Sequence, residues 1–366
     1  MCFEAVRKRG MILEYVKEQT PEICLEAIKE DRKAFRYVRE QTPELCLAAV
    51  KLDGNALEHI RNQTPEICLA AIKRNAFALG SVKEQTRELC LTAVQQHGYA
   101  LQYVKEQTPE ICMAAVQNDG YALQFVKEQT PEICLAAVQQ HDPALEYVKE
   151  QTPEICMAAV KQDGIAILDI KNQTPELCLT AVRQNGNAIK YIIKKTPELC
   201  LEAVKQKGSA LEYIDEQTEE ICLAAVKQYG WALEYAKEQN SEICLTAVKQ
   251  DGDLLRLVKE QTPEIRLEAV KNSGRALEYV DILTPNLCLE AVKQHGCALE
   301  YVPESEQTLP IAIAALKQDP ESRKFLADKF RKPEVYETAG YDYKIEDLAP
   351  SLRSKMKSRE IGLPFT

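Results

Sequence analysis

The sequence is poor in the residues that most often perform chemistry. It has one Trp and four His in 366 residues, and it shows no Ser/His/Asp order, glycine-rich phosphate loop or H-E-x-x-H pattern. Positive charge is also in short supply, because 46 Lys and Arg stand against 56 Asp and Glu, for a formal net charge of -10. Binding to a phosphate backbone needs clustered positive charge. We therefore expect a protein that is not an enzyme, with no cofactor, no metal and no small-molecule substrate, and nucleic acid is a disfavoured partner.

Long apolar runs are absent as well. Uninterrupted stretches such as 311–316 fall far short of the roughly 20 residues that span a bilayer, and no apolar export segment opens the chain. The 14 cysteines are diluted over a long sequence, unlike those of a short secreted disulfide scaffold. We expect an intracellular protein that is neither secreted nor membrane-spanning.

What the sequence has in abundance is self-similarity. A typical unit reads T-P-E-I-C-L-A-A-V-K-Q-D-G-x-A-L-E-Y-V-K-E-Q, and Arg266 takes the place of the one missing cysteine. We predict tandem 22-residue repeats over 1–302, a degenerate last repeat over 303–319, and a C-terminal cap with an extended tail over 320–366. The cysteines that recur with this period of 22 are Cys2, Cys24, Cys46, Cys68, Cys90, Cys112, Cys134, Cys156, Cys178, Cys200, Cys222, Cys244 and Cys288.

Each unit is predicted to form two short helices. Threonines such as Thr108 can cap the first helix, and the Pro that follows suits its first position. Glycines such as Gly98 are expected to close that helix with a left-handed turn. A second helix of about two turns follows, with Ala100, Leu101 and Val104 on its apolar face. Because one hairpin cannot bury both helices, we predict an all-α fold, an α-solenoid of about fourteen two-helix repeats. A leucine-rich repeat containing strands is the rival fold for this period.

The cysteines and histidines have structural explanations. Equivalent positions on helices about 8 to 10 Å apart are too distant for disulfides and cannot converge on a metal ion. The recurring cysteines are therefore expected to fill the core, whereas Cys297, which is off the period, is the thiol to test for reactivity. His97, His141 and His295 occupy one turn position and are expected to be interchangeable turn residues.

The residue nine places after each cysteine varies while its neighbours stay constant. An exposed recognition surface would vary in this way, and so would a tolerant loop edge. At this place Phe77, Tyr99 and Tyr121 are consecutive, which predicts an aromatic strip for partner binding, and Trp231 with nearby Tyr229 predicts a second spot. The tyrosines that recur in the second helix are predicted to pack between units.

Beyond the repeats the composition of the chain changes and the repeat pattern stops. A basic run predicts that the tail is an anchoring arm on a partner, and the alternative is an end cap with a loose tail. The amino terminus starts inside a unit, so either its first helix is frayed or the true chain starts earlier. The residues of the basic run are Arg353, Lys355, Lys357 and Arg359.

The amino-acid sequence of the repeat unit resembles that of a known family. The segment 130–150, T-P-E-I-C-L-A-A-V-Q-Q-H-D-P-A-L-E-Y-V-K-E, is similar to repeats known only as domain of unknown function 4116, and the resemblance covers residues 1 to about 319. Such repeats occur in giant viruses of amoebae, in protists and in their bacteria. The resemblance implies an intracellular setting, in the cytoplasm or in a virion, and an interaction or structural role. It implies no activity.

These observations favour a helical-repeat scaffold that binds other proteins, either alone or as a component of a large assembly such as a giant-virus particle. Three alternatives stay open. One is a reader of single-stranded nucleic acid, which would also present a variable position on stacked helices. The second is an effector that binds a host protein, and the third is an enzyme whose active site lies in the C-terminal tail.

Overall fold

The computed structural model describes residues 2–353, and these residues form helices and connecting segments without a strand. The predicted α-solenoid is therefore confirmed, and the leucine-rich repeat is excluded for this part of the chain. In nearly every repeat an α-helix of ten residues is followed by a 3₁₀ helix of six residues. The second helix is thus two turns long, as expected, but of the tighter 3₁₀ type.

The α-helices are α1 Cys2–Lys8, α2 Pro21–Glu30, α3 Pro43–Leu52, α4 Pro65–Arg74, α5 Arg87–Gln96, α6 Pro109–Asn118, α7 Pro131–Gln140, α8 Pro153–Gln162, α9 Pro175–Gln184, α10 Pro197–Gln206, α11 Glu219–Gln228, α12 Ser241–Gln250, α13 Pro263–Asn272, α14 Pro285–Gln294, α15 Leu309–Gln318 and α16 Pro333–Ala339. The 3₁₀ helices are η1 Gly10–Tyr15, η2 Arg32–Tyr37, η3 Gly54–His59, η4 Ala76–Ser81, η5 Gly98–Tyr103, η6 Gly120–Phe125, η7 Asp142–Tyr147, η8 Gly164–Asp169, η9 Gly186–Tyr191, η10 Gly208–Tyr213, η11 Gly230–Tyr235, η12 Gly252–Leu257, η13 Gly274–Tyr279, η14 Gly296–Tyr301, η15 Pro320–Phe325, η16 Asp328–Phe330 and η17 Ile345–Asp347.

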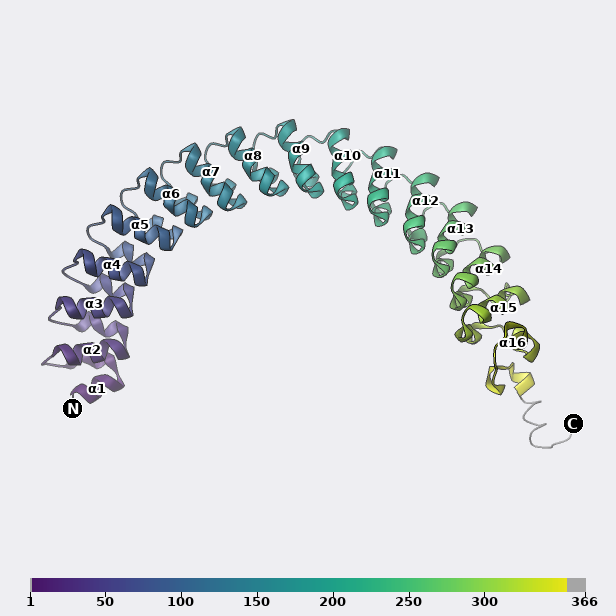
Figure 1. Ribbon diagram of the computed structural model, residues 1–366, viewed down its shortest axis with the longest axis horizontal. Helices are drawn as coiled ribbons and strands as arrows, with labels where there is room; N and C mark the ends of the chain where they lie inside the picture. Colours follow the sequence, from purple (N-terminus) through teal and green to yellow (C-terminus); the bar gives the residue numbers. More distant parts are fainter. Residues whose placement is uncertain (1, 354–366) are drawn as a thin grey trace. The chain divides into compact units, whose positions relative to one another are not determined.

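The chain forms two compact units, Met1–Gln184 and Asn185–Thr366. Within each unit, successive α-helices pack side by side in one layer, and the 3₁₀ helices pack in a second layer, each against its own α-helix and the α-helix of the next repeat (Figure 1). The core lies between these two layers. Because every helix contacts mainly its neighbours in sequence, the architecture is that of a repeat array.

Threonine caps start the α-helices as predicted. In α6 the Thr108 hydroxyl accepts a hydrogen bond from the Ile111 backbone N–H at 3.4 Å, and Pro109 occupies the first helical position. The helix ends where Asp119 becomes extended, and the Asp119 carboxylate accepts from the Tyr121 backbone N–H at 3.0 Å. One residue therefore ends the α-helix and caps the 3₁₀ helix that follows.

The role predicted for the recurring glycines is wrong. Among the described residues only Gly340 has a left-handed backbone, whereas Gly98 begins the 3₁₀ helix η5 with an ordinary φ. The reason for glycine is close packing, because a Cβ placed on Gly98 would lie 2.6 Å from the Ala115 carbonyl oxygen of the next repeat. Ala76 occupies the equivalent position in η4, so the array accommodates a methyl group in this one repeat.

The cysteines fill the core, as predicted. From Cys24 to Cys288 every cysteine of the period is buried, and burial raises the pKa of thiols such as Cys112. Cys112 is more than filler, since its Sγ lies 3.6 Å from the Gln107 side-chain oxygen. Where Arg266 replaces cysteine, the residue is 8% exposed and its guanidinium donates to the Ile282 carbonyl at 3.1 Å.

Sequence reasoning missed a row of glutamines that joins the repeats, which we call the glutamine ladder. Gln107 is typical: its Nε2 donates to the Phe125 carbonyl at 2.9 Å, and its Oε1 accepts from the Lys127 backbone N–H at 3.0 Å. Both partners belong to the next repeat. The same pair of bonds is made by Gln19, Gln41, Gln63, Gln85, Gln129, Gln151, Gln217, Gln239 and Gln261.

The ladder also explains where the strict period breaks. Leu283 takes the glutamine position, and the residue that would donate to it is Pro303, which has no N–H. The glutamine acceptor and the backbone N–H that would donate to it are therefore lost together at this junction. After the break Gln307 resumes the ladder, donating to the Phe325 carbonyl at 2.9 Å and accepting from the Ala327 N–H at 2.7 Å.

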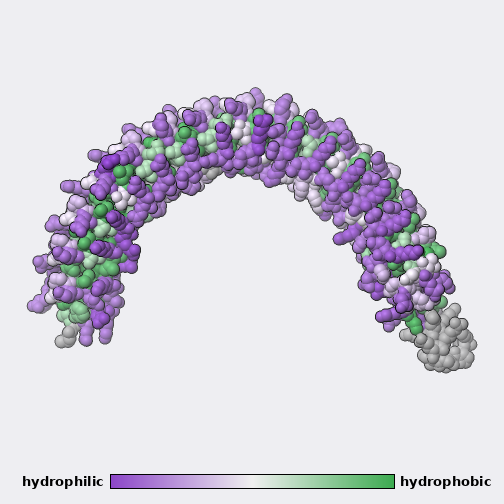
Figure 2. All heavy atoms as spheres, viewed as in Figure 1, coloured by the Kyte–Doolittle hydropathy of each residue, from purple (hydrophilic) through white to green (hydrophobic). Residues whose placement is uncertain are grey.

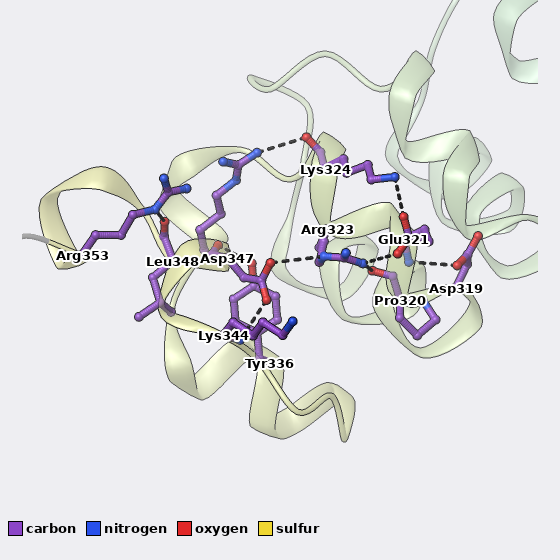
Figure 3. A network of polar contacts seen from close by, with 11 residues as sticks. Asp319, Pro320, Glu321, Arg323, Lys324, Tyr336, Lys344, Asp347, Leu348 and Arg353 are labelled. Carbon is purple, nitrogen blue, oxygen red and sulfur yellow. Dashed lines mark hydrogen bonds and ion pairs between the residues drawn. The ribbon is translucent and has the colours of Figure 1, made fainter. Parts of the chain in front are cut away.

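The last repeat and the cap differ in extent from the boundaries inferred above. The repeat of α15 continues through η15 to Phe325, beyond residue 319. The cap then packs Tyr336, which is fully buried, against the end of the array, and its hydroxyl donates to the Asp347 carbonyl at 2.7 Å. Figure 3 shows Arg323 reaching from η15 to the Asp347 carboxylate, 3.2 Å away. Residues 328–353 are thus a folded cap.

Candidate functional site

The predicted aromatic strip lies on the 3₁₀ layer of the first unit. Each of its rings meets, edge to face, a second aromatic ring from the next repeat. The ring centroids are 6.1 Å apart for Phe77 and Tyr103, 5.4 Å for Tyr99 and Phe125, and 6.3 Å for Tyr121 and Tyr147. Tyr103, Phe125 and Tyr147 of the second helix therefore pack between repeats, as predicted, and they extend the aromatic strip.

Two histidines add to these pairs. The His97 ring lies 4.8 Å from Phe77 and 5.6 Å from Tyr99, and the His141 ring stacks on Tyr121 at 5.4 Å. The prediction that His97 is a turn residue is confirmed, because its Nδ1 caps η5 by accepting from the Tyr99 N–H at 3.3 Å. The contact of the same ring with Phe77 was not predictable from the repeat pattern. We call the eight residues Phe77, His97, Tyr99, Tyr103, Tyr121, Phe125, His141 and Tyr147 the neutral aromatic surface.

These rings are accessible. Phe77 is 37% and Tyr103 is 40% exposed, and the rings of Tyr99 and Tyr121 are half-buried. Burial, followed by the nearby Asp119 carboxylate, raises the pKa of the Tyr99 hydroxyl, so this hydroxyl stays neutral and can donate. A row of exposed rings is typical of binding surfaces, because solvent contact with so much apolar area is otherwise unfavourable.

Two further positions of this stretch of the array lack the charge found in most other repeats, although the Asp119 carboxylate lies close to Tyr99. The fifth residue of the 3₁₀ helix is charged in most repeats, such as Glu58 and Glu146, but it is Gly80, Gln102 and Gln124 in η4, η5 and η6. The next-to-last residue of the α-helix is Lys or Arg in the other full repeats, but it is a glutamine in α5, α6 and α7, namely Gln95, Gln117 and Gln139. Aligning the repeats and comparing the residues at each repeat position would have revealed this loss of charge.

Local packing holds the rings in place. A Cβ on Gly80 would lie 2.8 Å from a carbon of the Tyr103 ring, so the missing side chain at Gly80 makes room for that ring. Gln102 donates from Nε2 to the Tyr99 carbonyl at 3.0 Å, and Gln124 donates in the same way to the Tyr121 carbonyl at 3.0 Å. These two amides are thereby held against the backbone beside the rings.

The second predicted spot is of a different kind. The Trp231 ring is half-buried, and the Arg256 guanidinium of the next repeat lies 4.6 Å from its centroid. Tyr229 is 45% exposed at the cap position of η11. An indole covered by a cation offers less free ring surface than the pairs in the first unit.

The structure describes only the first residue of the predicted basic run. Arg353 belongs to the cap, where its Nε donates to the Leu348 carbonyl at 2.6 Å (Figure 3). Lys355, Lys357 and Arg359 lie outside the described residues. The structure thus gives Arg353 a structural contact and leaves the anchoring arm as a prediction.

The connecting segments form another edge, with shallow hollows between repeats. One hollow of about 490 Å³ is lined by Asp215, Gln217 and Lys237, among others. Their polar groups already bind the protein itself: Gln217 belongs to the glutamine ladder, and the Lys237 Nζ donates to the Asp215 carbonyl at 2.7 Å. Elsewhere on this edge, too, lysines donate to the carbonyl of the equivalent residue one repeat earlier, for example Lys105 to Lys83 at 2.9 Å.

Hydrophilic residues cover most of the face that Figure 2 shows in each unit. Within residues 2–353 no helix is long and apolar enough to cross a membrane. In the same range no cluster of three or more His, Cys, Asp or Glu side chains could hold a metal ion.

A comparison with protein-family models identifies the repeat. The model of the domain of unknown function DUF4116 matches residues 86–130, 108–152, 174–218, 218–261, 240–283 and 262–307. The matches together cover more than half of the chain, and each spans two structural repeats. No curated protein matches the sequence. The chain therefore belongs to the DUF4116 family and contains several overlapping copies of its domain.

Proposed function

We propose that this protein is a non-catalytic scaffold that binds a protein partner through the neutral aromatic surface. The observation that supports the proposal most strongly is a coincidence of independent positions. In three consecutive repeats the variable residue is aromatic, and the same stretch of the array has lost the charge found elsewhere at two other positions. If one loop position simply tolerated any residue, three separate positions of the repeat would not change together.

The chemistry of this surface suits protein recognition. Tyrosine and other aromatic residues dominate the binding energy of protein interfaces, and charged residues are depleted at interface centres because each must be desolvated. Phe77, Tyr99 and Tyr121 provide such anchors, and the glutamines beside them add hydrogen-bonding groups without net charge. On a chain with a formal charge of -10, an uncharged aromatic area is distinctive.

We propose an intracellular setting for this scaffold, in the cytoplasm or in a virion. The family match supports this setting by resemblance, and a large assembly such as a giant-virus particle would use a regular array of docking positions. An effector that binds a host protein would use the same surface, and the identity of the captured partner distinguishes the two roles.

The test uses residues borrowed from sister repeats, so that the fold is retained. Tyr99→Ser and Tyr121→Asn copy Ser209 and Asn187, which occupy the same position in η10 and η9. The double variant and the wild-type protein are each used to capture partners from the native host, and the bound proteins are quantified by mass spectrometry.

We expect the double variant to lose specific proteins that a Trp231→Ser control keeps. Circular dichroism should show the same helical signal for all three proteins. Equal recovery of every protein by wild type and double variant would refute the docking surface. A salt-dependent shift of RNA that is lost in the double variant would instead indicate a nucleic-acid reader.

A further inference from the structure

We propose that the neutral aromatic surface binds an extended, proline-rich segment of its partner in the polyproline II conformation. The inference rests on the proposed function, because it names the chemistry of the partner for the same surface. It starts from a match of periods. Packed helices lie about 8 to 10 Å apart, so successive ring pairs are separated by about that distance along the array. A polyproline II helix has three residues per turn and rises about 3.1 Å per residue, which gives about 9 Å per turn.

This match places one proline of each turn on one ring pair. The three pairs are Phe77 with Tyr103, Tyr99 with Phe125, and Tyr121 with Tyr147, in consecutive repeats. A segment of about nine residues with proline at every third position would therefore contact all three pairs from one side. Aromatic-lined grooves are the usual receptors for such segments.

The geometry of each pair also suits proline. The two rings of each pair meet edge to face, at interplanar angles of 74°, 73° and 74°, and form a corner between the face of one ring and the edge of the other. The apolar, puckered pyrrolidine ring of proline can pack in that corner. The backbone carbonyls of a polyproline II segment make no internal hydrogen bonds, so they can accept from hydroxyls such as that of Tyr121.

Charge supports the same occupant. The fifth 3₁₀ position is uncharged at Gly80, Gln102 and Gln124, and it is acidic on both sides, at Glu58 and at Glu146. Proline-rich sequence carries no charge over the neutral stretch, and basic residues at its ends would face the bordering carboxylates. The segment that fits is therefore a proline-rich core with Lys or Arg at its ends.

A single-stranded nucleic acid is the competing occupant, since bases also stack on aromatic rings. Such binding needs a cationic groove along the phosphates. Here the positions that hold Lys or Arg in other repeats are Gln95, Gln117 and Gln139. The observations thus favour the peptide.

The experiment measures fluorescence anisotropy with the full chain and a labelled peptide that has proline at every third position and Lys at both ends. Matched probes have proline at every fourth position, glycine in place of proline, or an oligouridine of similar length. We expect the first probe to bind, and its Kd to rise at least about tenfold in Tyr99→Ser and in Tyr121→Asn, since a buried aromatic anchor contributes at least about 1.4 kcal/mol. Trp231→Ser should leave the Kd unchanged.

Several results would overturn the inference. These are no saturable binding of the first probe, equal binding of the glycine probe or of the four-residue period, an unchanged Kd in Tyr99→Ser, and tighter binding of oligouridine that Tyr99→Ser abolishes. Failure of the peptide can be told apart from failure of the scaffold. If the peptide does not bind while the double variant still loses host proteins, the scaffold stands and the polyproline segment is refuted; if neither effect is seen, both fall.

Discussion

Removing one side chain of the glutamine ladder should weaken a single junction of the array, and Gln107→Ala is the sharpest case. Gln107 donates to the Phe125 carbonyl at 2.9 Å and accepts from the Lys127 N–H at 3.0 Å, and both groups lie in the next repeat. The Cys112 thiol also lies 3.6 Å from the same glutamine oxygen. The substitution removes all three contacts and leaves the helices themselves unchanged.

The magnitude follows from the number of bonds. Each of the two bonds from the ladder to the backbone contributes about 1 kcal/mol net, and the thiol contact adds less, so the junction should lose about 2 kcal/mol. Stability of a repeat array is close to a sum of repeat and neighbour terms, so the loss should be confined to the interface between α6–η6 and the repeat before it. The Lys127 amide should then exchange its hydrogen about 30-fold faster.

Two measurements check this result. Urea unfolding followed by circular dichroism gives the change in the free energy of unfolding, and hydrogen exchange read by mass spectrometry gives the protection of the segment that contains Lys127. Gln139→Ala is the matched control, because Gln139 is an exposed glutamine at the end of α7, and its loss should change stability by less than about 0.5 kcal/mol. An unchanged urea midpoint together with unchanged exchange in Gln107→Ala would refute the bridging role of the ladder.

Three further changes test other features. Thr108→Ala removes an N-terminal cap and should lower the free energy of unfolding by about 1 kcal/mol in urea, with no change expected if the hydroxyl bond is unimportant. Burial and the neighbouring Asp319 carboxylate raise the pKa of Cys297 from 9.0 to about 11, so Asp319→Asn should lower this pKa and speed alkylation by iodoacetamide near pH 9; an unchanged rate would contradict the contact. For the same reason, the contribution of the Cys297 thiol to the free energy of unfolding should be fully present below about pH 9 and should decline as the pH rises through 11. Tyr336→Phe loses the hydroxyl bond to the Asp347 carbonyl and should cost about 1 kcal/mol, seen as faster hydrogen exchange in the cap but not in the repeats before it.

The parts of the fold that sequence could predict are those set by local chemistry. Thr108 followed by Pro109 marks a helix start, because capping involves residues within one turn. The burial of Cys112 and Ala115 follows from helical spacing of apolar residues in a stacked repeat. For the candidate site, the row of Phe77, Tyr99 and Tyr121 was visible in the repeat alignment of the chain with itself.

The parts that could not be predicted depend on residues of neighbouring repeats. Gly98 was expected to adopt a left-handed turn, but its place is required by the Ala115 carbonyl 17 positions later in the chain. The 3₁₀ form of the second helix was missed because six residues give too short a pattern to separate helix types. His97 could be recognised as a turn residue, and only its contact with Phe77 made it part of the site.

The amino-acid sequence by itself determined that this protein is an array of short helices with a buried row of cysteines, because an exact period of 22 forces every unit into the same environment. Only the tertiary structure decided how one unit meets the next. The bonds of Gln107 join residues 18 and 20 positions apart, and the ring pair of Tyr99 and Phe125 spans 26 positions. Such contacts are set by the register in which repeats stack, and that register is a property of packed side chains rather than of local sequence.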